Sequence, residues 1–148
     1  MTDDANAEAT DEGTDDGIDA DVILSAEEID LDGDGVVDGI TVTATYVEDV
    51  DGDGVADIVT EVSSTVIDVD GDGVPDITVT TETSVVDIDG DGVPDVIRQV
   101  VTTEVDVDGD GVPDIIDEVI TTGVDIDGDG ELDEIDVEEN TYVADDEG

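Results

Sequence analysis

Residues 68–76 read Asp-Val-Asp-Gly-Asp-Gly-Val-Pro-Asp, which places carboxylates at positions 1, 3, 5 and 9 of a nine-residue window. The same pattern returns almost unchanged at residues 87–95 and 106–114. Carboxylates crowded in this way repel one another unless a cation lies between them. The stretch therefore predicts either a cation-binding loop or a turn on a strongly acidic surface.

Aligned on this stretch, the chain contains six loops, numbered 1 to 6 here, which begin at residues 30, 49, 68, 87, 106 and 125. Successive loops start 19 residues apart without insertion, and such strict periodicity is typical of a repeat array. Four aspartates in each of the six loops account for 24 of the 49 acidic residues. The repeat thus organises the charge, which argues against a generic acidic tail.

The composition limits how much burial can stabilise a fold. The chain has 148 residues, one basic side chain (Arg98) and a formal net charge of −48. Tyr46 and Tyr142 are the only aromatic residues, and there is no Cys, so a core of small aliphatic residues would be thin and without disulfides. The charge repels nucleic acid and anionic membrane surfaces but attracts cations.

The ten-residue segments between the loops, such as 77–86, 96–105 and 115–124, predict β-strands. Val, Ile and Thr dominate them, and β-branched residues favour extended structure. Some valines of segment 96–105 have helical spacing, but the segments contain almost no strong helix formers. The proline at position 8 of loops 3 to 5 also biases the residue before it towards extended geometry. The predicted fold class is therefore all-β.

Two arrangements fit a 19-residue β repeat. In a β-solenoid resembling a β-roll, equivalent residues stack in parallel columns, for example Ile58, Ile77, Val96 and Ile115. In an antiparallel β-meander, each loop is a long hairpin turn. The meander lacks a clean apolar face along each strand, whereas the solenoid lacks a turn signal for its second corner. We favour the solenoid and keep the meander as the alternative.

Three segments are expected along the chain. Residues 1–21 form an acidic, disordered N-terminal segment, and residues 144–148 form an acidic tail. Residues 22–143 form the repeat domain, in which residues 22–29 are a cap and the six units follow. No apolar run is long enough to span a membrane, and the acidic start lacks the basic region of a signal peptide.

The pattern D-x-D-G-D-G-x-x-D resembles the calcium loop of EF-hand proteins. It is closer to the shorter DxDxDGxxD loops of dockerins, thrombospondin type 3 repeats and integrin-like propellers. Calcium takes six to eight oxygen ligands at about 2.3–2.6 Å, and side chains at positions 1, 3, 5 and 9 with the carbonyl at position 7 would supply five. Gly73 at position 6 permits a sharp turn, and Gly71 removes side-chain bulk between two ligands. The implied cofactor is Ca²⁺, about one ion per repeat, and the ions would staple the repeats together.

The same five positions give the candidate metal ligands of every loop. They are Asp30, Asp32, Asp34, Val36, Asp38, Asp49, Asp51, Asp53, Val55, Asp57, Asp68, Asp70, Asp72, Val74, Asp76, Asp87, Asp89, Asp91, Val93, Asp95, Asp106, Asp108, Asp110, Val112, Asp114, Asp125, Asp127, Asp129, Glu131 and Asp133. The bidentate glutamate that ends an EF-hand loop is absent at position 12. Such incomplete shells predict weak binding, with dissociation constants of roughly 10⁻⁵ to 10⁻³ M.

Catalysis is not expected. The chain has no His, Cys or Lys, which excludes the usual activated nucleophiles and Schiff bases. The loop aspartates are equivalent, so no acid–base pair stands apart.

The sequence instead predicts a calcium-binding structural repeat protein whose folding is coupled to the metal. Weak loops suit the high calcium concentration outside cells, which favours an extracellular or cell-surface spacer or adhesive module. One alternative is an acidic calcium buffer or mineral-binding polyanion, and another is a self-assembling β-fibre subunit. Calcium is the expected partner, with self-association or an unknown protein or surface as further possibilities; nucleic-acid binding and membrane insertion are not expected.

Overall fold

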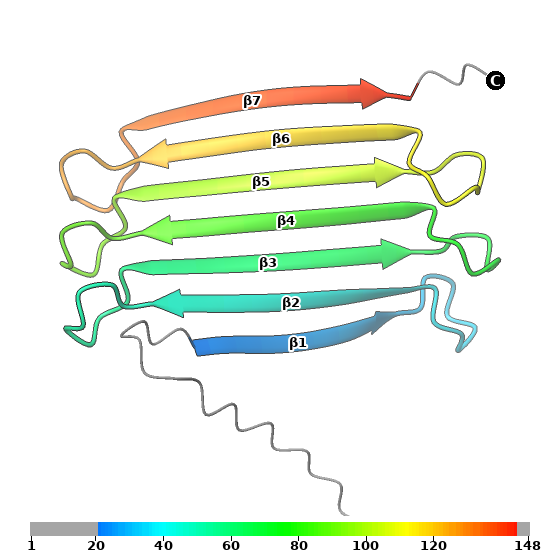
Figure 1. Cartoon of the computed structure of the whole chain (residues 1–148), viewed down its shortest axis with the longest axis horizontal. Coiled ribbons are helices and arrows are strands. Elements are labelled where there is room, and N and C mark those ends of the chain that lie inside the picture. Colours follow the sequence, from blue (N-terminus) through cyan, green and yellow to red (C-terminus); the bar gives the residue numbers. More distant parts are fainter. Residues whose placement is uncertain (1–20, 145–148) are drawn as a thin grey trace, which may run out of the picture.

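The computed structural model describes residues 21–144, which form one seven-stranded antiparallel sheet (Figure 1). The strands lie side by side in chain order, so the sheet is an up-and-down meander with β1 and β7 at its outer edges. Their bounds are β1 Asp21–Ile29, β2 Gly39–Glu48, β3 Ile58–Ile67, β4 Ile77–Val86, β5 Val96–Val105, β6 Ile115–Val124 and β7 Glu134–Val143. No helix in this part of the chain is long and apolar enough to cross a membrane.

The predicted strands are confirmed. Segments 77–86, 96–105 and 115–124 are β4, β5 and β6 with unchanged bounds, as their β-branched composition predicts. The segment 22–29, expected to cap the array, belongs to β1 and pairs with β2 along its whole length. The predicted disordered segment 1–21 and tail 144–148 lie outside the described residues, except for Asp21 and Ala144.

The structure does not confirm the β-solenoid; the observed arrangement is the alternative, the antiparallel meander. Ile77 and Ile115 of the predicted column share a cross-strand row through Val105. Ile58 and Val96 instead share a row through Val86 at the other end of the strands. The reason is the missing second corner, because ten residues without a turn signal continue as one straight strand and the loop then reverses the chain.

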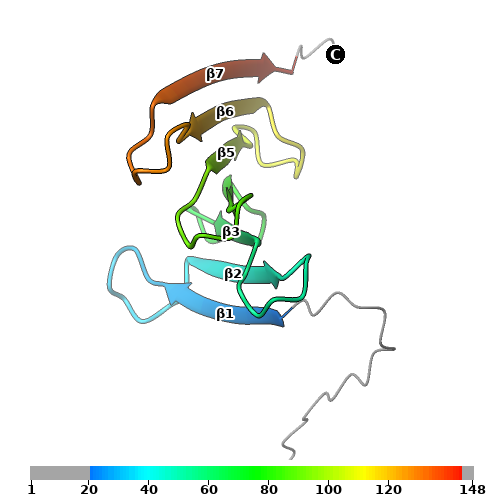
Figure 2. The same cartoon turned by 90° about the vertical axis from the view of Figure 1, so that its left-hand side faces the viewer.

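The sheet is a single twisted layer. Figure 2, turned by 90° from Figure 1, shows the strand direction rotating steadily from β1 to β7, as the twist of β-strands requires. No second layer covers either face, and no hydrophobic side chain among residues 21–144 is buried. Many aliphatic side chains are partly buried by their neighbours on the same face, but none of those described is fully buried, so burial stabilises this sheet less than it stabilises a two-layer fold.

Apolar contacts concentrate where the strands meet the loops. One row at the strand ends consists of Ile29, Gly39, Ile67, Ile77, Val105, Ile115 and Val143. The middle rows of the sheet carry many threonines and serines, and several pair across strands. The Oγ1 atoms of Thr41 and Thr65 are 2.8 Å apart, and Thr43 Oγ1 donates to Ser63 Oγ at 3.3 Å. Hydrogen bonds between hydroxyl groups therefore add to the aliphatic pairs of the middle rows, such as Val100 with Ile120.

Gly39 is expected to resist substitution although its row is otherwise aliphatic. It is buried, and a Cβ added there would lie 2.6 Å from the backbone carbonyl oxygen of Val66. Gly39→Ala should therefore lower the free energy of unfolding by about 1–3 kcal/mol, measured by urea unfolding in excess calcium. Gly123→Ala is the control, because its Cβ would meet only the flexible side chain of Leu132. Equal losses in the two variants would contradict the backbone clash.

Candidate metal-binding loops

The six loops lie at the two ends of the strands. Loops 1, 3 and 5 are at the right-hand end of Figure 1 and loops 2, 4 and 6 at the left-hand end. In each loop the N–H of the position 9 aspartate donates to the carbonyl of the last strand residue before the loop, at 2.8–2.9 Å. The chain therefore closes each nine-residue loop on itself before the next strand begins.

The first aspartate of each loop is held by two backbone donors. In loop 3, the N–H of Gly71 donates to Oδ1 of Asp68 at 2.7 Å and the N–H of Gly73 donates to Oδ2 at 2.8 Å. The equivalent pair recurs in the other five loops. A carboxylate oxygen has two lone pairs, so these bonds orient the aspartate and leave it able to bind a cation.

The other three aspartates each accept a loop N–H at one oxygen. Asp70 Oδ1 accepts the N–H of Asp72 at 3.0 Å, and Asp72 Oδ1 accepts the N–H of Val74 at 2.7 Å. Asp76 Oδ2 accepts the N–H at position 2 of the same loop. These bonds recur in the other loops. The loop backbone thus wraps around its own carboxylates.

The structure brings many of the predicted ligands together. In loops 1, 3, 4 and 5, carboxylate oxygens at positions 1, 3 and 9 lie within 4.8 Å of one another. In loop 2 the same holds for Asp49, Asp51 and Asp53 at positions 1, 3 and 5, and one further group of this kind exists among the described residues. Ligands on opposite sides of one calcium ion are roughly 4.8 Å apart, so each group fits a single ion.

Some predicted ligands are not members of these groups. They are the position 5 aspartates of loops 1, 3, 4 and 5, namely Asp34, Asp72, Asp91 and Asp110, and the position 9 aspartate of loop 2, Asp57. The carbonyl ligands predicted at position 7 stay a prediction. The side-chain oxygens brought together number three per group, fewer than the six to eight that calcium takes.

The prediction that Gly71 removes side-chain bulk between two ligands is wrong. A Cβ added at Gly71 would meet nothing within 4 Å, so the residue does not make room between two ligands. Its φ angle is +75° and that of Gly73 is +91°, and residues other than glycine rarely adopt such φ angles. Both glycines therefore provide the backbone geometry that turns their N–H groups towards Asp68.

The pKa values of the loop aspartates differ between positions 1 and 3. At position 1 of loops 3, 5 and 6, hydrogen bonds from the loop backbone lower the pKa. The N–H of Gly73 lowers the pKa of Asp68, and that of Gly130 lowers the pKa of Asp125. Burial raises the pKa of Asp106, but hydrogen bonds from Gly111 and Gly109 outweigh it and the net pKa is lowered.

The opposite holds at position 3 of loops 5 and 6. The charges of Asp129 and Asp133 raise the pKa of Asp127. The N–H of Asp110 lowers the pKa of Asp108, but repulsion from Asp110, burial and repulsion from Asp114 and Asp106 together outweigh it, and the net pKa is raised. In these two loops, position 3 therefore carries repulsion that a proton or a cation would relieve.

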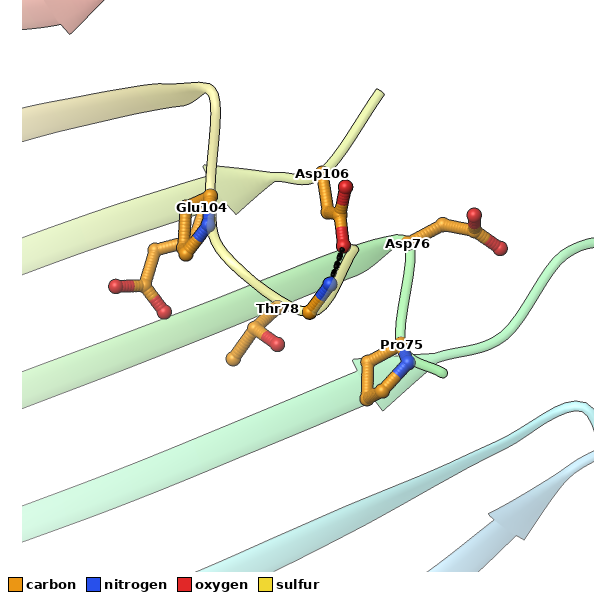
Figure 3. Close-up of a pocket in the computed structure, with 7 residues that line it drawn as sticks. Pro75, Asp76, Thr78, Glu104 and Asp106 are labelled. Carbon is orange, nitrogen blue, oxygen red and sulfur yellow. Dashed lines mark hydrogen bonds between the residues drawn. The ribbon is translucent and has the colours of Figure 1, made fainter. Parts of the chain in front are cut away.

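A cleft of about 290 Å³ lies between loops 3 and 5, two repeats apart (Figure 3). It is lined by Pro75, Asp76, Thr78, Glu104, Asp106, Gly111 and Pro113. In Figure 3 the carboxylates of Asp76 and Glu104 point away from each other, and Asp106 accepts the N–H of Gly111 at 2.7 Å. The cleft therefore does not gather its carboxylates, and the candidate metal chemistry stays within the loops.

Sequence reasoning missed a second set of backbone bonds, which join loops at the same end of the sheet. The N–H of Asp68 donates to the carbonyl of Asp38 at 2.8 Å, and the N–H of Asp106 donates to that of Asp76 at 2.9 Å. Asp87 with Asp57, and Asp125 with Asp95, repeat this bond at the other end. No sequence signal could have revealed it, because it exists only when alternate loops share one end of a meander.

Comparison of the chain with models of protein families, with curated proteins and with solved structures finds no match.

The shifted pKa values predict how the metal-free protein responds to acid. Asp108 and Asp127 have raised pKa values, so stability grows as the pH falls through them. Asp68, Asp106 and Asp125 have lowered pKa values, so stability is lost as the pH falls below 3.8 towards them. In excess chelator, the far-ultraviolet circular dichroism signal of strands should therefore rise from pH 7 to a maximum near about pH 4 and then fall.

The double variant Asp108→Asn, Asp127→Asn is the control for this titration, because it removes the two carboxylates that prefer a proton. It should show a smaller gain between pH 7 and pH 4. A strand signal that declines steadily from pH 7 in the unsubstituted protein would contradict the assignment.

Proposed function

We propose that this chain is a calcium-binding structural repeat protein whose folding is coupled to metal binding. The observation that carries the proposal is the convergence of carboxylate oxygens to within 4.8 Å in loops of repeated geometry. The shared geometry favours discrete sites over the diffuse cation binding of a flexible polyanion. Oxygen ligands without His or Cys suit calcium, whereas magnesium demands tighter octahedral geometry and zinc and copper prefer nitrogen or sulfur.

We expect metal binding to be coupled to folding because the sheet has no buried apolar core to offset its negative charge. No hydrophobic side chain among residues 21–144 is buried, and the full chain carries a net charge of −48. Six calcium ions would reduce that charge to −36 and would relieve repulsion at Asp108 and Asp127. Binding free energy therefore becomes folding free energy, and the metal-free chain at low salt is expanded.

The biological use that we propose is a spacer or adhesive module at a cell surface or outside cells. Three carboxylates per group predict weak sites, which fill where calcium is plentiful. The long and narrow loops at both ends of an uncovered sheet also offer many equivalent attachment points for cations. No catalytic role is proposed, because the loop aspartates are equivalent and the chain has no His, Cys or Lys.

Calcium titration by isothermal calorimetry, with circular dichroism on the same samples, tests the proposal. We expect several ions per chain and a cooperative gain of strand signal. The variant Asp70→Asn, Asp72→Asn should bind about one ion fewer, because it removes two negative charges from loop 3, one of them from the group of Asp68, Asp70 and Asp76. It keeps the Oδ1 acceptors of the loop hydrogen bonds. A matched substitution outside the loops, Glu82→Gln, should leave the stoichiometry unchanged. Equal strand content in chelator and in calcium, both at low salt, would reject the coupling.

A second candidate function, self-association, is favoured by the outer strand β1. Its residues Val22, Ile23 and Leu24 are 51%, 63% and 71% exposed, and an uncovered apolar edge strand is a template for pairing with another chain. The other outer strand, β7, carries Glu134, Asp136, Glu138 and Glu139, which repel a second copy. Antiparallel pairing of β1 with β1 of a second copy uses the same edge of both copies, so it joins them as a closed dimer.

Sedimentation in saturating calcium tests this second candidate. We expect a dimer that Ile23→Lys converts to a monomer, because a charge on the edge opposes pairing. Ile135→Lys is the matched control, since Ile135 lies on the other outer strand and is 62% exposed. A monomer at every concentration, or fibres in place of dimers, would contradict pairing through β1.

A further inference from the structure

The loops are connected by backbone hydrogen bonds that skip one repeat. Among the described residues, the backbone bonds that join one loop to another run between loops two repeats apart, at 2.8–2.9 Å. They connect Asp38 with Asp68, Asp57 with Asp87, Asp76 with Asp106, and Asp95 with Asp125. The loops therefore form two series, one of loops 1, 3 and 5 and the other of loops 2, 4 and 6.

The bonds of Asp38 with Asp68 and of Asp76 with Asp106 each connect a member of one candidate metal group to a member of the next. Asp76 of loop 3 contributes a carboxylate oxygen to its own group and accepts the N–H of Val69. Its carbonyl accepts the N–H of Asp106, the first aspartate of loop 5, whose carboxylate belongs to the next group. A single hydrogen bond between two peptide groups thus separates a ligand of loop 3 from a ligand of loop 5.

The first aspartates of the later loops are buried. Asp87, Asp106 and Asp125 each follow an earlier loop of their series and are only 8%, 7% and 4% exposed. Asp30 is exposed, and Asp49 and Asp68 are partly buried. Loop 5 also approaches loop 3, because a Cβ built at Gly111 would lie 4.0 Å from Val74 Cγ1. An ordered loop therefore provides part of the surroundings that hold the first aspartate of the loop two repeats later.

Loops that are consecutive in sequence lack this connection. They lie at opposite ends of a ten-residue strand, and such a strand is about 33 Å long. That distance is several times the Debye length of about 8 Å at physiological ionic strength. Direct charge interaction between the ions of consecutive loops is therefore small.

We infer that calcium binding is cooperative along each end of the sheet, so that an ion in one loop strengthens binding in the loops two repeats away. Consecutive loops are coupled less. The inference rests on the function proposed above and specifies how its sites are regulated. An ion that orders Asp76 fixes the carbonyl that positions Asp106, and linkage makes the effect equal in both directions.

Calcium chloride titrations of the full chain, followed by nuclear magnetic resonance at physiological ionic strength, test this inference. The position 6 glycines (Gly35, Gly54, Gly73, Gly92, Gly111 and Gly130) give one amide reporter per loop, because each donates to the first aspartate of its loop. The test variant is Asp70→Asn, Asp72→Asn in loop 3. The matched variant at the other end is Asp89→Asn, Asp91→Asn in loop 4.

Disabling loop 3 should weaken calcium binding at loops 1 and 5 by at least about fivefold and leave loops 2, 4 and 6 within about twofold. Disabling loop 4 should weaken loops 2 and 6 and spare loops 1, 3 and 5. The N–H of Asp106 should also exchange faster with solvent in the loop 3 variant. If the loop 3 variant does not fold, the single substitution Asp70→Asn makes the same test, with Asp89→Asn as its match in loop 4.

Glu104→Gln separates coupling through the backbone from simple charge loss, because Glu104 lines the cleft between loops 3 and 5 but belongs to neither loop. It should change the affinity of loop 5 by less than about twofold. An equal loss in this variant, or equal effects on consecutive loops, would overturn the inference. Absence of calcium-dependent shifts at all six glycines in the unsubstituted protein would instead reject the proposed function itself.

Discussion

The capture of two glycine N–H groups by the first aspartate of each loop is the constraint on which the rest of the structure depends. Asp68 holds Gly71 and Gly73 in this way, and their positive φ angles are needed for the N–H groups to reach it. These bonds fold the first six residues of the loop around the aspartate, and the bond from the position 9 N–H to the preceding strand closes the loop. The closed loop reverses the chain and delivers the next strand antiparallel to the last.

The same bonds gather negative charge that the loop cannot neutralise by itself. Backbone N–H groups lower the pKa of Asp68 and Asp125, so these carboxylates keep their charge. That charge adds to the repulsion at position 3, where the pKa of Asp127 is raised by its acidic neighbours. The geometry that folds the loop therefore also creates its need for a cation, which links the fold to the proposed function.

Because the sheet has only one layer, its stability depends more strongly on cation binding by the loops. Most domains bury an apolar face of each sheet against a second layer, but here both faces are open and no hydrophobic side chain among residues 21–144 is buried. The aliphatic row through Ile67, Ile77 and Val105 lies beside the loops, so its contacts depend on ordered loops. Stability is thus concentrated at the two ends of the strands, where the carboxylates also lie.

Much of this architecture could be predicted from the sequence. The β-branched segments gave β4, β5 and β6 with their observed bounds, and the spacing of Asp30, Asp32 and Asp38 predicted a group that the fold assembles. The choice between solenoid and meander could not be made from periodicity, because both arrangements repeat every 19 residues. The missing turn signal within β4 and β5 distinguishes the two arrangements, because a solenoid needs a second corner and a meander does not.

The connection between alternate loops lies beyond sequence reasoning for a different reason. The bond from the N–H of Asp106 to the carbonyl of Asp76 uses backbone groups alone. Such a bond does not depend on the residue type, so the sequence does not indicate it. It follows from strand number and direction, since only an up-and-down meander returns every second loop to the same end of the sheet. A solenoid of the same sequence would couple each loop to the next one. The order in which the six loops respond to calcium is therefore a property of the topology, although their ligands are a property of the repeat.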